Sequence, residues 1–177
     1  MNMKQRVRCV LFMAFMVVIC VGCNRTKPQT PANRPMQDTV ALALIELNQR
    51  YAQEAATHLA FYANQLPHPY VLDDMGYWYR IVEQGSDVPV QGLEQVTLHR
   101  QEYALEDSLV LYRDEVIHVK PEKKEVMEAI DRAFEHLHVG DSVSILAPWF
   151  LAYGPKGDGA DILPYTSLRI ELRVLAE

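Results

Sequence analysis

A repeat of apolar positions predicts a long helix near the start of the folded part of the chain. The apolar residues recur every three or four positions from Val40, with Glu, Gln and Arg mostly between them, at Leu44, Leu47, Tyr51, Ala55, His58 and Tyr62. This spacing places them on one face of a helix. Asp38 or Thr39 can cap the first turn, and "PHPY" follows Leu66. We therefore assign residues 38–68 to an amphipathic N-terminal helix.

The apolar face of this helix needs a partner. It can pack on the sheet of its own domain, or on the same helix of a second copy, so a homodimer through residues 39–66 is one of two arrangements that the pattern allows. A helix lying on a membrane surface is disfavoured, because its polar face is not rich in Lys or Arg.

After Pro69 the pattern changes to short segments rich in aromatic and β-branched residues, which is typical of strands. "GYWYRIVEQGSD" places Tyr77, Tyr79 and Ile81 on one face, and "EQVTLHRQEYAL" and "SLVLYRDEVIHV" are joined at residues 106–108 in an expected hairpin.

A second change of period, in "KKEVMEAIDRAFEHL", predicts a helix over residues 123–137 that stops before Gly140. Its apolar face is expected to comprise Val126, Ile130, Ala133, Phe134 and Leu137. "DSVSILAPWFL" and "TSLRIELRVLA" alternate again, so we expect strands there, with Trp149 and Phe150 alternating on the first of them. The predicted class is α+β: an antiparallel sheet wrapped on a short helix, preceded by a long N-terminal helix.

The first residues have the organisation of an export signal. Three basic residues precede an apolar run from Cys9 to Val21, and Gly22 stands before Cys23. The run is shorter than the ~20 residues that span a bilayer, so a cleaved signal over residues 1–22 is favoured over a transmembrane anchor. "CVGC" resembles the lipobox of bacterial lipoproteins, although Cys20 stands where leucine is usual. The resemblance implies that Cys23 is acylated and becomes the mature N-terminus.

The segment after the lipobox indicates a tether and a place in the cell. Residues 23–37 carry three prolines and no periodic apolar pattern, as in an extended linker. The residue after the lipidated cysteine is Asn24 and not an aspartate. In some bacteria, a residue other than aspartate at this position directs a lipoprotein to the outer membrane. We therefore expect a membrane-anchored lipoprotein of the cell envelope, on the periplasmic face of the outer membrane.

Charge and cysteine content fit that location. Loss of residues 1–22 removes three basic residues and no acidic one, so the formal net charge of −6 becomes −9. A domain this acidic is a poor partner for nucleic acid. The chain has 3 cysteines, and none lies after Cys23, so the mature domain has no disulfide to form.

The residues that carry metal or nucleophile chemistry are not arranged for it. His136 and His138 are two positions apart and diverge on a helix. Ser142 lies on an expected strand without the sharp turn of a hydrolase nucleophile. Asp158 and Asp161 fit no calcium-loop spacing. We expect neither a metal ion nor another cofactor.

The order of motifs in the second half of the chain resembles that of FKBP-type peptidyl-prolyl cis-trans isomerases. A helix leads to Gly140-Asp141, then to a strand, to "AYG" at residues 152–154, to "ILP" at residues 162–164 and to a last strand at 168–175. We accordingly assign residues 69–177 to an FKBP-like domain. Together with the lipobox, the helix, "GYWY" and "YALEDSLVLY", the sequence looks most like the gliding-motility-associated branch of FKBP-type lipoproteins.

The resemblance implies a peptidyl-prolyl isomerase that assists the folding of proline-containing exported proteins. The catalytic residue that the resemblance implies is Tyr153, which matches the tyrosine whose hydroxyl bonds a substrate carbonyl. Met127 matches a residue whose backbone amide is offered to the ligand. The substrate-binding residues implied in this way are Tyr112, Val126, Met127, Ile130, Ala152, Ile162, Leu163 and Ile170.

The chain departs from the family at several of these positions. The family's acidic residue falls on Tyr112 or Arg113, and its first-strand tyrosine falls near Arg100. Three aromatic positions fall on the aliphatic residues Ile117, Ile130 and Ile170. Two functions therefore stay open: an isomerase of low activity, or an FKBP-like module that holds a client or an assembly partner without turnover.

Overall fold

The structure is a computed structural model that describes residues 34–105 and 110–175, without the side chains of residues 34–38 and Glu122. The chain divides into two compact units, Met1–Ala43 and Leu44–Glu177. The predicted signal peptide, the predicted acylation site Cys23 and the turn expected at residues 106–108 lie outside the described residues, as does most of the predicted linker.

The long helix is present and starts earlier than predicted. Helix α2 spans Arg34–Gln65, so Asp38 and Thr39 lie inside it and the prediction that either caps it was wrong. Pro35 stands in the first described turn, where the missing backbone N–H removes no helical hydrogen bond. None of the described helices is long and apolar enough to cross a membrane.

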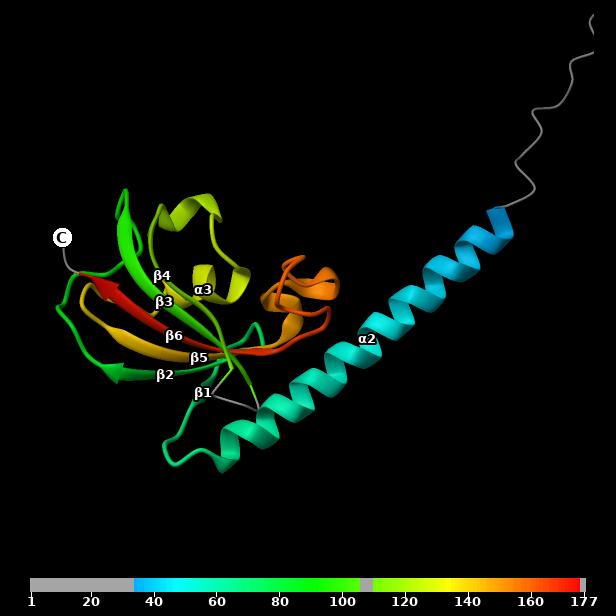
Figure 1. Cartoon of the computed structure of the whole chain (residues 1–177), viewed down its shortest axis with the longest axis horizontal. Helices are drawn as coiled ribbons and strands as arrows, with labels where there is room; N and C mark the ends of the chain where they lie inside the picture. Colours follow the sequence, from blue (N-terminus) through cyan, green and yellow to red (C-terminus); the bar gives the residue numbers. More distant parts are fainter. Residues whose placement is uncertain (1–33, 106–109, 176–177) are drawn as a thin grey trace, which may run out of the picture. The chain divides into compact units, whose positions relative to one another are not determined.

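The sheet has six strands in the order β1-β2-β5-β6-β3-β4, and every neighbouring pair is antiparallel (Figure 1). The expected pairing of residues 94–105 with 108–119 is confirmed, since Arg100 lies opposite Glu115 and Val96 opposite Val119. The strands are β1 (Val71–Leu72), β2 (Trp78–Glu83), β3 (Val96–Ala104), β4 (Leu111–Val119), β5 (Ser142–Ala147) and β6 (Leu168–Leu175).

The second helix is shorter than its apolar period predicted. Helix α3 spans only Glu128–Ala133, after the 3-10 turn η1 (Pro121–Lys123). Lys124 adopts a left-handed backbone with φ 51°, and Met127 is extended with φ −60° and ψ 151°. Because neither conformation fits a helix, the predicted helix over residues 123–137 was wrong in its N-terminal turn. Its C-terminal residues Phe134 and Leu137 are buried in the core, although they follow the helix.

The strand predicted over residues 141–151 also ends early. β5 stops at Ala147, and the 3-10 turns η2 (Trp149–Leu151) and η3 (Gly154–Lys156) follow. Pro148 has no N–H to donate to the strand ladder, so the chain leaves the sheet there. Trp149 and Phe150 therefore do not alternate on a strand, which corrects the prediction: Trp149 is 6% exposed and Phe150 37%.

The two faces of the sheet bury different partners. Val143, Ile145 and Ala147 of β5 join the main core with α3. Leu146, which points the other way because side chains alternate along a strand, joins a smaller cluster with Leu59. That smaller cluster also contains Ala63 and Leu105.

The face of α2 that is buried is not the predicted repeat. Leu59 and Ala63, which lie outside the repeat, are the buried apolar residues of this helix. Of the repeat itself, Tyr62 packs against the small cluster, whereas Leu44 is 54% exposed. The C-terminal turns of the helix therefore pack on the sheet of their own domain, and Leu44 is left without an apolar cover.

Within the Leu44–Glu177 unit, Trp149 and Tyr165 contact the helix through hydrogen bonds. The Trp149 Nε1–H donates to the Tyr51 carbonyl at 3.3 Å, and the Tyr165 hydroxyl donates to Asn48 Oδ1 at 2.9 Å. The Trp149 and Tyr165 rings lie 4.8 Å apart. Tyr165 has φ +61°, a conformation that costs a non-glycine residue of order 1 kcal/mol. The aromatic residues around the loop thus serve the helix contact.

Candidate functional site

The base of the site is a set of three isoleucines, Ile130 of α3, Ile170 of β6 and Ile162 of the loop before it. They are 0%, 0% and 2% exposed, and we call them the apolar floor. Burying each such side chain contributes about 1.5–3 kcal/mol to folding. Because none of the three side chains has a polar atom, they form an apolar part of the main core.

The predicted site residues, with one exception, are part of the main core or its margin. All but Leu163 belong to the main core or pack against it as partly buried residues: Tyr112, Val126, Met127, Ile130, Ala152, Tyr153, Ile162 and Ile170. Leu163 is 69% exposed. Whether any of these residues binds substrate stays a prediction.

Tyr153 is bonded to a carboxylate that the sequence analysis did not predict. Its hydroxyl donates to Glu102 of β3, at 2.8 Å from Oε2 and 3.1 Å from Oε1. Glu102 is fully buried. Burial, together with the charge and hydrogen bond of Glu102, raises the pKa of Tyr153 to about 12. The phenol is therefore neutral at physiological pH.

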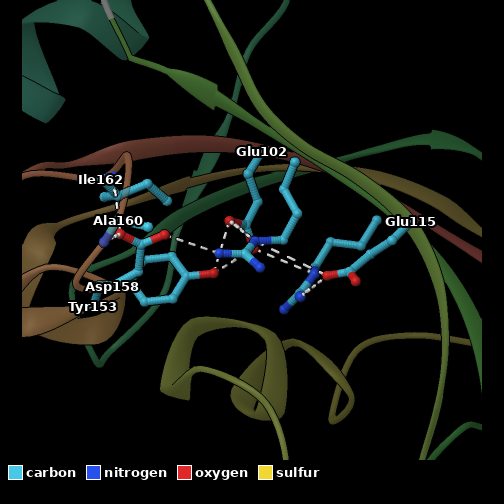
Figure 2. Close-up of polar contacts among 8 residues, drawn as sticks. Glu102, Glu115, Tyr153, Asp158, Ala160 and Ile162 are labelled. Atoms are coloured by element: carbon cyan, nitrogen blue, oxygen red, sulfur yellow. Dashed lines mark hydrogen bonds and ion pairs between the residues drawn. The ribbon is translucent and has the colours of Figure 1, made fainter.

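Glu102 lies at the centre of a set of ion pairs (Figure 2). Arg100 Nε lies 3.3 Å from Oε1, and Arg113 Nε donates to Oε2 at 3.3 Å. Arg100 also pairs with Glu115, and Arg113 Nη2 donates to Asp158 Oδ2 at 3.0 Å. We call these five residues the charged cluster. A buried carboxylate held in this way is strongly destabilised when one partner is removed.

The loop after Tyr153 is folded around Asp158. Asp158 Oδ1 accepts hydrogen bonds from the backbone N–H groups of Ala160 and Ile162, both at 2.9 Å. These two bonds are the main reason why the pKa of Asp158 lies below its usual value. Gly157 has φ +69°, and a Cβ there would lie 2.1 Å from the Ile162 carbonyl oxygen. The tight turn requires glycine and delivers Ile162 to the floor.

Met127 provides a backbone donor beside the floor. It precedes α3 in an extended conformation, and its carbonyl accepts bonds from the amides of Ile130 and Asp131. Within the described part of the chain, its own N–H donates no backbone hydrogen bond. An unused amide at this place agrees with the role that the resemblance implies for Met127.

Two positions at which the chain departs from the family contribute charged residues to this cluster. Arg100 lies on β3 and Arg113 on β4, and both pair with Glu102. A signal was present: Leu98, Arg100 and Glu102 alternate on one face of β3. Two charged residues on the core-facing side of a strand indicate a buried pair.

The chemistry available here is binding and polarisation. Among residues 34–105 and 110–175, no three His, Cys, Asp or Glu side chains are grouped to hold a metal ion. The site combines an apolar floor, a neutral phenol, a free amide and paired guanidinium groups.

Comparison with known proteins gives a fold. No protein-family model and no curated protein sequence matches the chain. The N-terminal domain of FKBP42 from Arabidopsis thaliana is 16% identical with a TM-score of 0.56, and covers 63% of this chain and 94% of its own. A peptidyl-prolyl cis-trans isomerase from Pseudomonas syringae is 17% identical with a TM-score of 0.58, covering 73% and 94%.

FkpA from Escherichia coli is similar over nearly the whole chain. It is 14% identical with a TM-score of 0.58, and the alignment covers 99% of this chain and 82% of FkpA. These identities are low, and what the three structures share with this chain is architecture. The chain therefore has the α+β fold of FKBP-type peptidyl-prolyl isomerases, preceded by a long helix.

Proposed function

We propose that the chain is a peptidyl-prolyl cis-trans isomerase that assists the folding of exported proteins. The observation that carries the proposal is the apolar floor of Ile130, Ile162 and Ile170 lying beside a neutral Tyr153 and the unused Met127 amide. A prolyl peptide bond rotates against a resonance barrier of ~18–20 kcal/mol. Rotation needs no nucleophile; it needs a site that favours the twisted amide.

The residues of the site can perform this task by binding. The floor accepts the proline ring and keeps water from the amide, because none of its three side chains has a polar atom. The Met127 N–H can hold a carbonyl of the peptide while the prolyl bond turns. Every 1.4 kcal/mol by which the twisted form is bound better than the planar form accelerates rotation about tenfold.

The experiment is an isomerisation assay without protease. Residues 24–177 are added to a set of Xaa–Pro peptides, and return to the cis/trans equilibrium is followed after a solvent jump. We expect acceleration in proportion to protein concentration. An unchanged rate, with protein shown by circular dichroism to be folded, contradicts the proposal.

A second function, client binding without turnover, is favoured by the charged cluster. The Tyr153 proton is used by Glu102, and the aromatic residues that the resemblance implies for the walls are replaced by Ile117, Ile130 and Ile170. Such a site can hold an extended segment and release it unchanged. Suppression of aggregation of an unfolded protein, measured with wild type and Tyr153→Ala, separates the two functions: the binding module keeps this activity in the variant.

The location proposed for the protein is the cell envelope, with Cys23 acylated and residues 23–37 as the tether to the periplasmic face of the outer membrane. The lipobox resemblance supports this, and the same features support membership of the gliding-motility-associated branch. Metabolic labelling with a palmitate analogue tests the anchor: label is expected on wild type and absent from Cys23→Ser.

A homodimer through residues 39–66 is proposed for the mature protein. Leu44 and Ile45 are 54% and 53% exposed, and Val40 and Leu42 are 55% and 66% exposed. Exposed apolar residues in a helix are covered when two helices pair. Sedimentation at several concentrations tests this, with a monomer at all concentrations as the contrary result.

A further inference from the structure

The Tyr153 hydroxyl has no proton left for a substrate. A phenol has one O–H donor, and here that proton is directed to Glu102, whose two oxygens lie 2.8 and 3.1 Å away. Its oxygen offers the substrate only lone pairs. A group in the peptide that needs a donor finds none at Tyr153 while this bond is made.

Arg113 is the side chain beside Tyr153 that has donors to spare. A guanidinium has five N–H groups. Nε donates to Glu102 and Nη2 to Asp158, and Nη1 makes no hydrogen bond to another described residue. The Arg113 guanidinium carbon lies 5.6 Å from the centre of the Tyr153 ring, and the side chain is 33% exposed. The side chain is therefore partly open to solvent, and Nη1 is left without a partner among the described residues.

Arg100, the other arginine of the charged cluster, is less suited. Its side chain is only 11% exposed, and it lies between Glu102 and Glu115. Arg100 therefore serves to neutralise Glu102. Arg113, the more exposed of the two arginines, is the charged donor that a bound peptide can reach.

We infer that Arg113 is a catalytic residue that donates a hydrogen bond to the prolyl nitrogen of the substrate as the peptide bond twists, with Glu102 and Asp158 as its positioning residues. The inference rests on the proposed isomerase function and identifies its donor. In the planar amide the nitrogen lone pair is delocalised into the carbonyl. Twisting localises that pair on nitrogen, where it accepts a hydrogen bond.

A donor used in this way changes the rate of isomerisation and leaves the affinity for the peptide almost unchanged. The bond to nitrogen exists only in the twisted form, so it stabilises the transition state and leaves the affinity for planar peptide almost unchanged. The fixed pairs to Glu102 and Asp158 hold the guanidinium in place before substrate arrives, so little reorganisation is needed. Tyr153 contributes its ring as a platform under the guanidinium.

The test separates rate from affinity in the full-length chain purified in detergent. Exchange NMR on an Xaa–Pro peptide at saturation gives the catalysed rate, and titration gives the peptide Kd. For Arg113→Gln we expect the rate to fall about 10- to 100-fold, the range for loss of one charge-assisted hydrogen bond, with Kd within about twofold. Arg173→Gln, an exposed arginine on β6 with a 59% exposed side chain, is the matched control and keeps the wild-type rate.

A second variant guards against misfolding, because Arg113→Gln removes one partner of buried Glu102. The double variant Glu102→Gln, Arg113→Gln replaces the ion pair with two neutral amides, so that residue 102 has no buried charge left without Arg113. We expect the same loss of rate from this chain, with thermal unfolding showing that it is folded.

The outcomes are distinguishable. A wild-type chain that does not accelerate isomerisation contradicts the proposed function, and this inference with it. If the wild type is active and both Arg113 variants keep its rate within about twofold, or lose affinity in step with rate, the proposed function stands and the role of Arg113 is overturned.

Discussion

The apolar floor and the charged cluster lie in one site and are held by opposite kinds of interaction. Ile130, Ile162 and Ile170 are buried with no polar atom to satisfy. Glu102 is buried to the same degree, but both its oxygens are occupied by Tyr153, Arg100 and Arg113. The floor therefore tolerates changes of shape better than changes of polarity. The charged cluster depends on the direct partners of the buried Glu102 being present.

The largest effect is expected from Glu102→Ala. It leaves Arg100 and Arg113 without their shared carboxylate in a largely buried place, and breaking a buried pair costs about 3–5 kcal/mol. The free energy of unfolding in urea measures the loss. Glu115→Ala, at a side chain that is 37% exposed, is the control and costs less, since exposed pairs contribute ~1 kcal/mol or below. Equal losses in the two variants contradict the central place of Glu102.

A smaller effect is expected from Tyr153→Phe. The variant keeps the ring under Arg113 and removes one donor from the buried carboxylate, which costs about 1–3 kcal/mol. Thermal unfolding measures it. Tyr103→Phe is the control, because the Tyr103 ring contacts Arg169 and no hydrogen bond of its hydroxyl within the described residues supports a buried charge. A variant Tyr153→Phe as stable as wild type shows that Glu102 does not need this bond.

On the floor, Ile130→Val is expected to cost about 0.5–1.5 kcal/mol, because one methylene is removed from a close-packed core. The same variant widens the place proposed for the proline ring, so peptide affinity is expected to fall with little change in the position of the charged cluster. Urea unfolding and peptide titration check both effects. Ile45→Val, at a residue that is 53% exposed, should change neither.

The last effect appears only at the alkaline end, as a dependence of stability on pH. Burial and the Glu102 carboxylate raise the pKa of Tyr153 to about 12 from an ordinary value of 10.0. A group whose pKa is raised by folding stabilises the fold below its unfolded pKa, so this contribution is complete below pH 10 and is lost as the pH rises to about 12. Over that range, wild type should lose its advantage in unfolding free energy over Tyr153→Phe. An advantage that stays constant contradicts the shift.

The sequence predicted the floor and the sheet more fully than the charged cluster. Period-two alternation located β3, β4 and β6, and the apolar spacing in residues 123–137 identified Ile130, even though α3 is only six residues long. Two of the differences had local causes: the left-handed Lys124 and the extended Met127 delay the start of helix α3, and Pro148 ends β5.

The charged cluster could not be predicted in the same way, because its partners come from separate segments. Glu102 meets Arg113 only through the β3–β4 register, and Asp158 arrives from a loop 45 residues after Arg113. The spacing of apolar residues within one segment carries no information about pairing between segments. The buried face of α2 was missed for a related reason. Leu59 and Ala63 pack with Leu105 and Leu146, which come from distant segments, while Leu44 of the predicted repeat is exposed.

The most direct test of the site is an NMR titration of the isoleucine methyl groups with an Xaa–Pro peptide. Chemical-shift changes are expected at Ile130, Ile162 and Ile170, and none at Ile45, which lies in the long helix. Changes confined to Ile45, or no change in any of the four from a folded chain at millimolar peptide concentration, would contradict the claim that the apolar floor is where proline binds.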